Sequence, residues 1–198
     1  MPSRKSVLVL AIVAVLAPAS VPAQDGLLGI YFDISGNECS GDISTASFAT
    51  LYVLLHPEGA TMGGTVGAEF RIESPAGGAF LMTGEQAAAG ANVQIGSAFG
   101  DGTNIAFPTC QSGSTVPILS FQVFSSGAPA SDGLLRVRAH ARPSNAAFPC
   151  PLAVLCDATY TKVCTEGGLA VLNPTGRQAC GSSRIDSQWS RVKDLYRP

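Results

Sequence analysis

Apolar and polar residues alternate with a period of two in many short segments of this chain. Such alternation is typical of a β-strand that has one face in a core and the other in solvent. In Val66–Glu73 the alternation predicts that Phe70 and Ile72 point inward and that Glu69 and Arg71 point outward. Where a segment is instead apolar at nearly every position, we expect a strand in the middle of its sheet.

The pattern predicts nine strands, separated by Gly, Pro, Ser and Asp clusters that favour turns. They are Leu27–Ile34, Phe48–His56, Val66–Glu73, Val93–Phe99, Thr103–Phe107, Val116–Phe124, Leu134–Ala141, Thr159–Cys164 and Leu169–Leu172. Gly100-Asp101-Gly102 and Glu166-Gly167-Gly168 predict two hairpin turns. Because no amphipathic helix separates the strands, we expect an all-β chain that forms an antiparallel sandwich with disulfide crosslinks. The order and length of the strands resemble those of immunoglobulin-like and cohesin-like sandwiches, and this likeness is one of fold alone.

The C-terminus departs from this pattern. Trp189 and Val192 recur at helical spacing, and Asp186-Ser187 can begin a helix. We therefore predict a short amphipathic helix at about 187–196, which packs on the sandwich through the only tryptophan.

The N-terminus has the features of an export signal. Arg4 and Lys5 precede an apolar run, Val7–Ala17, which is too short to span a membrane. We predict a signal peptide over 1–23, cleaved after Ala23, or alternatively after Ala19. Residues 24–198 would then form one domain that is secreted or periplasmic and has no stable membrane insertion.

All six cysteines follow the predicted cleavage site: Cys39, Cys110, Cys150, Cys156, Cys164 and Cys180. An even number of cysteines in an exported chain indicates disulfides, and the lack of a C-x-x-C pair argues against a metal centre. Six cysteines allow 15 pairings, so the connectivity stays open. We favour Cys164 with Cys180, and Cys110 or Cys39 with Cys150 or Cys156.

Charge is distributed unevenly along the chain. Residues 24–135 contain ten acidic residues and one basic residue, Arg71, whereas residues 136–198 contain nine basic and four acidic residues. Nucleic-acid binding requires a denser basic patch than two lysines and scattered arginines provide, so we expect no nucleic-acid partner. The two halves are expected to interleave in one fold and to neutralise each other.

Candidate catalytic residues are few. The chain has two histidines, His56 and His140, and lacks the G-x-S-x-G, H-E-x-x-H, P-loop and dinucleotide motifs. We therefore identify no catalytic residue and expect a non-catalytic protein. The alternative is a hydrolase whose site is assembled by the fold, with a histidine close to a serine and an aspartate.

Carboxylates on one predicted strand suggest an ion-pair ladder. Glu69 and Glu73 flank Arg71 on one face, and we expect Arg136 and Arg138 to lie opposite them in an ion-pair ladder.

Calcium is the one metal that the sequence favours. Asp101 and Asn104 in one Gly-rich stretch, and Asp33, Glu38 and Asp42 in another, offer the oxygen ligands that it prefers. Neither stretch matches an EF-hand loop, and Asp-Gly-Thr-Asn is also a common turn sequence. We therefore expect no cofactor, with calcium as the alternative.

Three stretches carry a resemblance to known proteins. They are G-I-Y-F-D with G-A-E-F-R-I in residues 29–72, C-D-A-T-Y-T-K-V-C at Cys156–Cys164, and W-S-R-V-K-D-L-Y-R at Trp189–Arg197. These stretches resemble a group of exported bacterial proteins whose function is unknown, so the resemblance implies export and assigns no activity. The expected role is a binding or structural module outside the cytoplasm, with an unidentified protein or glycan partner. The alternative to that role, besides a hydrolase, is a calcium- or carbohydrate-binding module.

Overall fold

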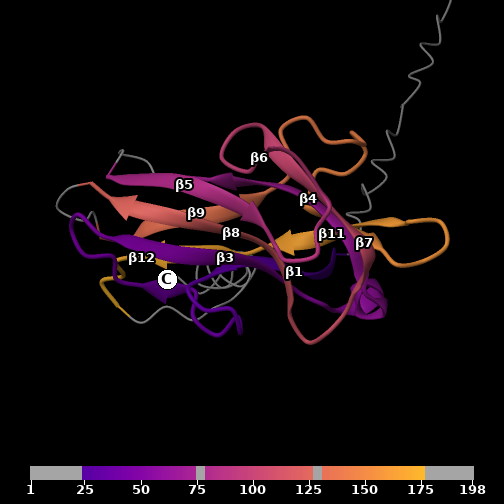
Figure 1. Cartoon of the computed structure of the whole chain (residues 1–198), viewed down its shortest axis with the longest axis horizontal. Helices are drawn as coiled ribbons and strands as arrows, with labels where there is room; N and C mark the ends of the chain where they lie inside the picture. The colour runs from indigo at the N-terminus through magenta and orange to yellow at the C-terminus, as the bar shows by residue number, and fades with distance from the viewer. Residues whose placement is uncertain (1–23, 75–78, 127–130, 177–198) are drawn as a thin grey trace, which may run out of the picture.

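A computed structural model describes residues 24–74, 79–126 and 131–176. It shows an all-β sandwich whose long strands run side by side (Figure 1). The predicted signal peptide, Cys180 and the predicted helix at 187–196 lie outside the described residues. In the described ranges no helix has the length and apolar character needed to cross a membrane.

One layer of the sandwich contains six strands in the order β5-β8-β3-β1-β11-β10. All neighbours are antiparallel except β1 and β11, which are parallel. The strands are β1 (Gln24–Tyr31), β3 (Phe48–His56), β5 (Phe80–Ala87), β8 (Val116–Ser125), β10 (Leu152–Leu155) and β11 (Lys162–Gly167).

The second layer has the order β2-β12-β9-β4-β7-β6. Its strands are β2 (Ser40–Gly41), β4 (Thr65–Glu73), β6 (Val93–Ser97), β7 (Gly102–Gln111), β9 (Gly133–Arg138) and β12 (Leu169–Leu172), and a 3-10 turn, Gly59–Gly63, precedes β4. The first half of β4 pairs with β10 and its second half pairs with β9. Strand β4 therefore joins the two layers along one side.

The inward side chains of both layers form one apolar core. Val53 and Phe121 from the first layer and Phe70 and Leu135 from the second are at most 1% exposed. The alternation predicted Phe70 and Leu135 to be inward, whereas Val53 and Phe121 lie in segments that are apolar on both faces. Burial of this apolar surface is the main term that stabilises the fold.

The predicted hairpin at Glu166-Gly167-Gly168 is wrong. Strand β11 pairs with β1 and β10, whereas β12 pairs with β9 and β2, so the chain crosses here from one layer to the other. A Cβ on Gly167 would lie 2.2 Å from the carbonyl oxygen of Val137, and one on Gly168 would lie 2.8 Å from the Cα of Gly29. The two glycines allow close backbone packing at the crossing, which sequence alone does not distinguish from a turn.

The hairpin at Gly100-Asp101-Gly102 is confirmed, because β6 pairs antiparallel with β7 across it. Three strands were missed by the sequence analysis: the two-residue β2, β5 and β10. Strand β5 contains a bulge between Thr83 and Gln86 that interrupts its alternation, and β10 has only four residues.

Two disulfides crosslink the described residues: Cys110–Cys156 and Cys150–Cys164. The predicted pairing of Cys164 with Cys180 is therefore wrong. Leu152 and Cys164 are register partners in the β10–β11 hairpin, which brings Cys150 within reach of Cys164. Cys39 is also disulfide-bonded.

Candidate functional site

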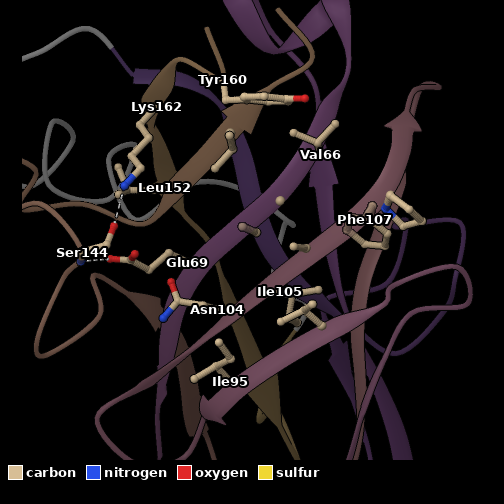
Figure 2. Close-up of a pocket in the computed structure, with 16 residues that line it drawn as sticks. Val66, Glu69, Ile95, Asn104, Ile105, Phe107, Ser144, Leu152, Tyr160 and Lys162 are labelled. Carbon is tan, nitrogen blue, oxygen red and sulfur yellow. Dashed lines mark hydrogen bonds between the residues drawn. The ribbon is translucent and has the colours of Figure 1, made fainter. Parts of the chain in front are cut away.

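A groove of about 570 Å³ lies on the outer face of β10, β4, β7 and β6 (Figure 2). Tyr160 and Lys162, from the end of the β10–β11 connection and the start of β11, border it on one side, and Val93 and Ile95 of β6 border it on the other. The groove is a surface feature of the second layer, opposite the core.

Small side chains form the floor of the groove and so deepen it. Gly67 of β4 pairs with Ala106 of β7, and the same row continues to Val93 of β6 and Val154 of β10. A glycine and an alanine at the centre of this row leave room that larger side chains on both sides enclose. The floor and most of the walls are thus apolar.

Exposed apolar side chains form the β6 border of the groove. Val93 is 40% exposed and Ile95 is 63% exposed, and Tyr160 on the opposite border is 64% exposed. Large apolar side chains exposed beside an apolar hollow are a typical mark of a binding surface.

The next row of the sheet forms the polar end of the groove. It runs from Ile95 through Asn104 and Glu69 to Leu152. Asn104 points into the groove beside Glu69 (Figure 2). No hydrogen bond is formed by its side-chain amide within the described ranges, so the amide can serve a ligand.

Glu69 holds a loop against the sheet at this end. Its side chain is 4% exposed, and its Oε1 accepts a hydrogen bond of 2.9 Å from the backbone N–H of Ser144. Lys162 Nζ donates to Ser144 Oγ at 2.8 Å (Figure 2). These contacts fix the loop at residues 139–145 as the end wall of the groove.

This polar cluster lacks the features of a nucleophilic site. A serine nucleophile needs a neighbouring base that accepts its proton, and a lysine does so only when burial keeps it neutral. Lys162 is only partly buried and donates its hydrogen bond to Ser144. The arrangement therefore favours positioning of the loop over catalysis.

The two histidines lie apart from the groove lining. The ring of His56 is 5.0 Å from that of Tyr31, and its Nε2 has no hydrogen-bond partner in the described chain. Burial lowers the pKa of His56 and raises that of Tyr31 to about 12. His140 Nδ1 accepts the backbone N–H of Arg142 at 3.0 Å. Across the described ranges, no hydrogen bond joins either histidine to a serine or an aspartate.

The calcium candidates are separated by the fold. Asp101 lies on the β6–β7 turn, where its carboxylate is 3.0 Å from Arg142, whereas Asn104 lies in the groove. Asp33 accepts hydrogen bonds from the backbone of Asn37 and Glu38 and from the hydroxyl of Ser35. Burial would raise the pKa of Asp33, but these hydrogen bonds outweigh it and lower the pKa.

Glu38 and Asp42 lie in the exposed segments between β1 and β3. Within the described part of the chain, no three His, Cys, Asp or Glu side chains converge in a way that suits a metal ion.

The predicted ion-pair ladder is half right. Strands β4 and β9 are neighbours, and Arg138 Nε lies 2.9 Å from Glu73 Oε2. Glu69 lies beyond the end of that pairing and takes part in the groove instead. The alternation correctly predicts its face, but it does not predict that the loop at 139–145 covers that face.

The outer face of β3, β8 and β5 is a second exposed surface. Phe48, Phe124 and Leu81 form one row across it, and Thr50, Gln122 and Thr83 form the next. Phe48 and Leu81 are 60% and 55% exposed. These two rows are uncharged, and they provide a comparison surface for the groove.

The free edges of β5 and β6 face each other and are bridged by side chains. Glu85 of β5 accepts hydrogen bonds from Gln94 Nε2, Ser97 Oγ and the backbone N–H of Ala98. Ala87 N–H donates to Gln94 Oε1 at 3.1 Å. This bridge occupies the β6 edge, which makes it a poor template for an added strand.

Solved structures with the same fold are cohesin modules. A cohesin module from a Clostridium perfringens family 33 glycoside hydrolase superposes with a TM-score of 0.53 at 8% identity, over 77% of this chain and 99% of that chain. The sixth cohesin of Acetivibrio cellulolyticus scaffoldin B, solved in complex with a Cel5 dockerin mutant, gives 0.51 at 16% identity, over 76% of this chain and 99% of that chain. The fold is thus a cohesin-like, immunoglobulin-like β-sandwich. No protein family and no curated protein matches the sequence.

Sequence analysis missed the groove. The available signal was a pair of small residues, Gly67 and Ala106, at positions where the alternation predicts outward side chains. Val93 and Ile95 were predicted to be in a strand, but their exposure follows from the position of β6 at the end of its layer, which no local pattern specifies.

Proposed function

We propose that this chain is an exported, non-catalytic module that binds another protein through the groove on β10, β4, β7 and β6. The observation that carries the proposal is the apolar hollow at Gly67 and Ala106, bordered by the exposed side chains of Val93, Ile95 and Tyr160. An apolar centre with polar groups at one end is the usual composition of a protein-binding site.

Three further observations support this role. The fold is shared with a cohesin solved in complex with a dockerin. Two disulfides in the described chain are consistent with an oxidising compartment outside the cytoplasm. The histidines, which a hydrolase of this sequence would need, form no hydrogen bond with a serine or an aspartate in the described residues.

Capture of secreted proteins tests the proposal. The mature chain, residues 24–198, is immobilised and exposed to the secreted fraction of the organism that encodes it, and bound proteins are identified by mass spectrometry. A groove variant combines Val93→Ser with Ile95→Ser. Both side chains are exposed enough that we expect a loss of at most about 1 kcal/mol in folding stability.

The matched control combines Phe48→Ser with Leu81→Ser on the outer face of β3, β8 and β5, where both side chains are similarly exposed. We expect one defined protein to bind the wild type and the control but to be lost from the groove variant. Equal capture by all three chains, or loss only from the control, would show that the groove is not the binding site.

A further inference from the structure

We propose that the segment bound in the groove is an acidic stretch of polypeptide, whose apolar side chains enter the hollow and whose carboxylates contact the surrounding basic side chains. This inference rests on the proposed protein-binding function of the groove. It adds the chemistry of the partner, which neither the fold nor its structural neighbours specify.

Every lysine and arginine in the described residues lies on or beside the sheet face that carries the groove. Arg71 is on β4, Arg136 and Arg138 are on β9, Arg142 is on the loop after β9, and Lys162 borders the groove itself. The arginines of β4 and β9 alternate with the buried Phe70, Ile72, Leu135 and Val137, so they point to the outer face. The uneven charge of the sequence thus becomes a spatial concentration of cations beside the groove.

Three of these cations form no ion pair in the described residues, although the Glu73 carboxylate interacts at longer range with Arg71 and Arg136. Arg138 pairs with Glu73 and Arg142 pairs with Asp101. Arg71, Arg136 and Lys162 have no carboxylate within ion-pairing distance in the described ranges. Lys162 donates one hydrogen bond to Ser144 Oγ, so two of its three N–H donors are available to a ligand.

Three acidic side chains of β4, β5 and the β10–β11 connection accept hydrogen bonds from other groups of the protein. Glu69 accepts the backbone N–H of Ser144, and Glu85 accepts three hydrogen bonds across the β5–β6 seam. Asp157, in the β10–β11 connection, accepts the N–H and hydroxyl of Thr161. None of these carboxylates lies within ion-pairing distance of Lys162, so a carboxylate of a partner can pair with that lysine.

The spacing suits an extended chain. Glu69, at the polar end of the groove, and Glu73, which is the register partner of Arg136, are four residues apart on β4, which corresponds to about 13 Å. An extended segment of about eight residues that fills the hollow and continues over the loop at residues 139–145 can reach the arginines beyond it.

The lining of the groove favours polypeptide over acidic polysaccharide. Branched aliphatic side chains and a glycine-alanine floor accommodate apolar side chains, whereas sugar binding generally depends on aromatic platforms and dense hydrogen bonding. Of the two aromatic residues that line the groove in the described chain, Tyr160 is 64% exposed and Phe107 is only 5% exposed. An acidic polysaccharide is accordingly an outcome that the test must exclude.

A displayed library of random 12-residue peptides, selected on the mature chain, provides the probe. We expect the selected peptides to combine Leu, Ile or Phe with Asp and Glu. Binding of a selected peptide is then measured by fluorescence anisotropy, beside the same peptide with Asn and Gln in place of Asp and Glu. We expect the uncharged peptide, and the wild-type complex in high salt, to bind about fivefold or more weakly.

Two pairs of substitutions test which part of the surface contributes the charge that the peptide contacts. Arg136→Gln with Lys162→Gln removes two positive charges beside the groove, and Thr50→Glu with Gln86→Glu changes the net charge equally on the β3 and β5 side. We expect the first pair to weaken binding about fivefold and the second to leave it nearly unchanged.

The outcomes separate this inference from the proposed function. Peptides that need Val93 and Ile95 but lack acidic residues, and bind independently of salt, would overturn the acidic partner and leave the binding groove in place. Peptides that bind regardless of Val93 and Ile95 would overturn both. Heparin and polygalacturonate test for a polysaccharide partner. If either binds more tightly than any peptide, and if this binding depends on Arg136 and Lys162 but not on Ile95, the natural partner is a polysaccharide and the proposed polypeptide is wrong.

Discussion

At the residue scale, Glu69 connects the groove to the loop that closes it. Its carboxyl group is nearly buried and its Oε1 accepts the N–H of Ser144. Glu69→Leu removes this acceptor, and we expect the free energy of unfolding to fall by about 1–2 kcal/mol. Glu69→Gln keeps a carbonyl oxygen in the same place and should lose less than half as much. Urea unfolding of both variants measures the difference, and equal losses would contradict the role of this hydrogen bond.

Glu73 gives a pH dependence of defined sign. The hydrogen bond from Arg138 lowers the pKa of Glu73 from its ordinary value of 4.5. The stabilisation is therefore complete above pH 4.5 and is lost as the pH falls through the lowered pKa of the folded state. Because the pair is about half exposed, we expect at most about 1 kcal/mol.

The measurement compares wild type with Glu73→Gln in urea at pH 7, 4 and 3. The stability difference should shrink towards zero as the pH decreases, and Arg138→Gln should show the same convergence with the wild type. A difference that grows on acidification would contradict the assignment.

At the element scale, the crossing from β11 to β12 depends on glycine. A Cβ at residue 167 would meet the backbone oxygen of Val137 at 2.2 Å, whereas one at Gly63 would have no neighbour within 4 Å. We expect Gly167→Ala to lower the free energy of unfolding by about 2–3 kcal/mol and Gly63→Ala to change it little. Thermal unfolding of the two variants checks this, and a tolerated alanine at 167 would refute the close packing.

The two disulfides fix the walls around the groove. Cys110–Cys156 joins the end of β7 to the connection that carries Tyr160, with a separation of 46 residues, and Cys150–Cys164 spans 14 residues. Chain-entropy estimates give losses of about 4 and about 3 kcal/mol for replacing each pair with serine or alanine. Of the two disulfide replacements, Cys110→Ser with Cys156→Ser should weaken peptide binding more, because it releases the wall of the groove that contains Tyr160. Fluorescence anisotropy measures the change in peptide binding, and urea unfolding measures the change in stability.

The strands show which elements can be predicted from the sequence and which cannot. Phe48–His56 was predicted with the bounds that the structure gives, because a long apolar run between turn signals is specified locally. The bulged β5 and the four-residue β10 were missed, because their positions depend on pairing with β8 and β4. The Cys164 pairing was mispredicted for the same reason, since it follows from the β10–β11 register.

At the scale of the whole molecule, the alternation was sufficient to predict a two-layer β-sandwich, and the fold of the cohesin modules agrees with it. The groove was beyond that analysis, since it arises where β10 and β7 both join β4 and place Val154, Gly67 and Ala106 in one row. The distribution of charge was also predicted only in part. The sequence showed its segregation along the chain, and only the strand order showed that the cations gather beside the groove.

Site-specific photo-crosslinking tests the central claim most directly. A benzophenone amino acid is placed at Ile95, on the groove border, and separately at Leu81, on the outer face of β5, in the chain of residues 24–198. Each protein is irradiated with the secreted fraction of its own organism, and the adducts are identified by mass spectrometry. The account predicts one dominant protein adduct at position 95 and little at 81; adducts at 81 alone, or equally at both positions, would contradict it.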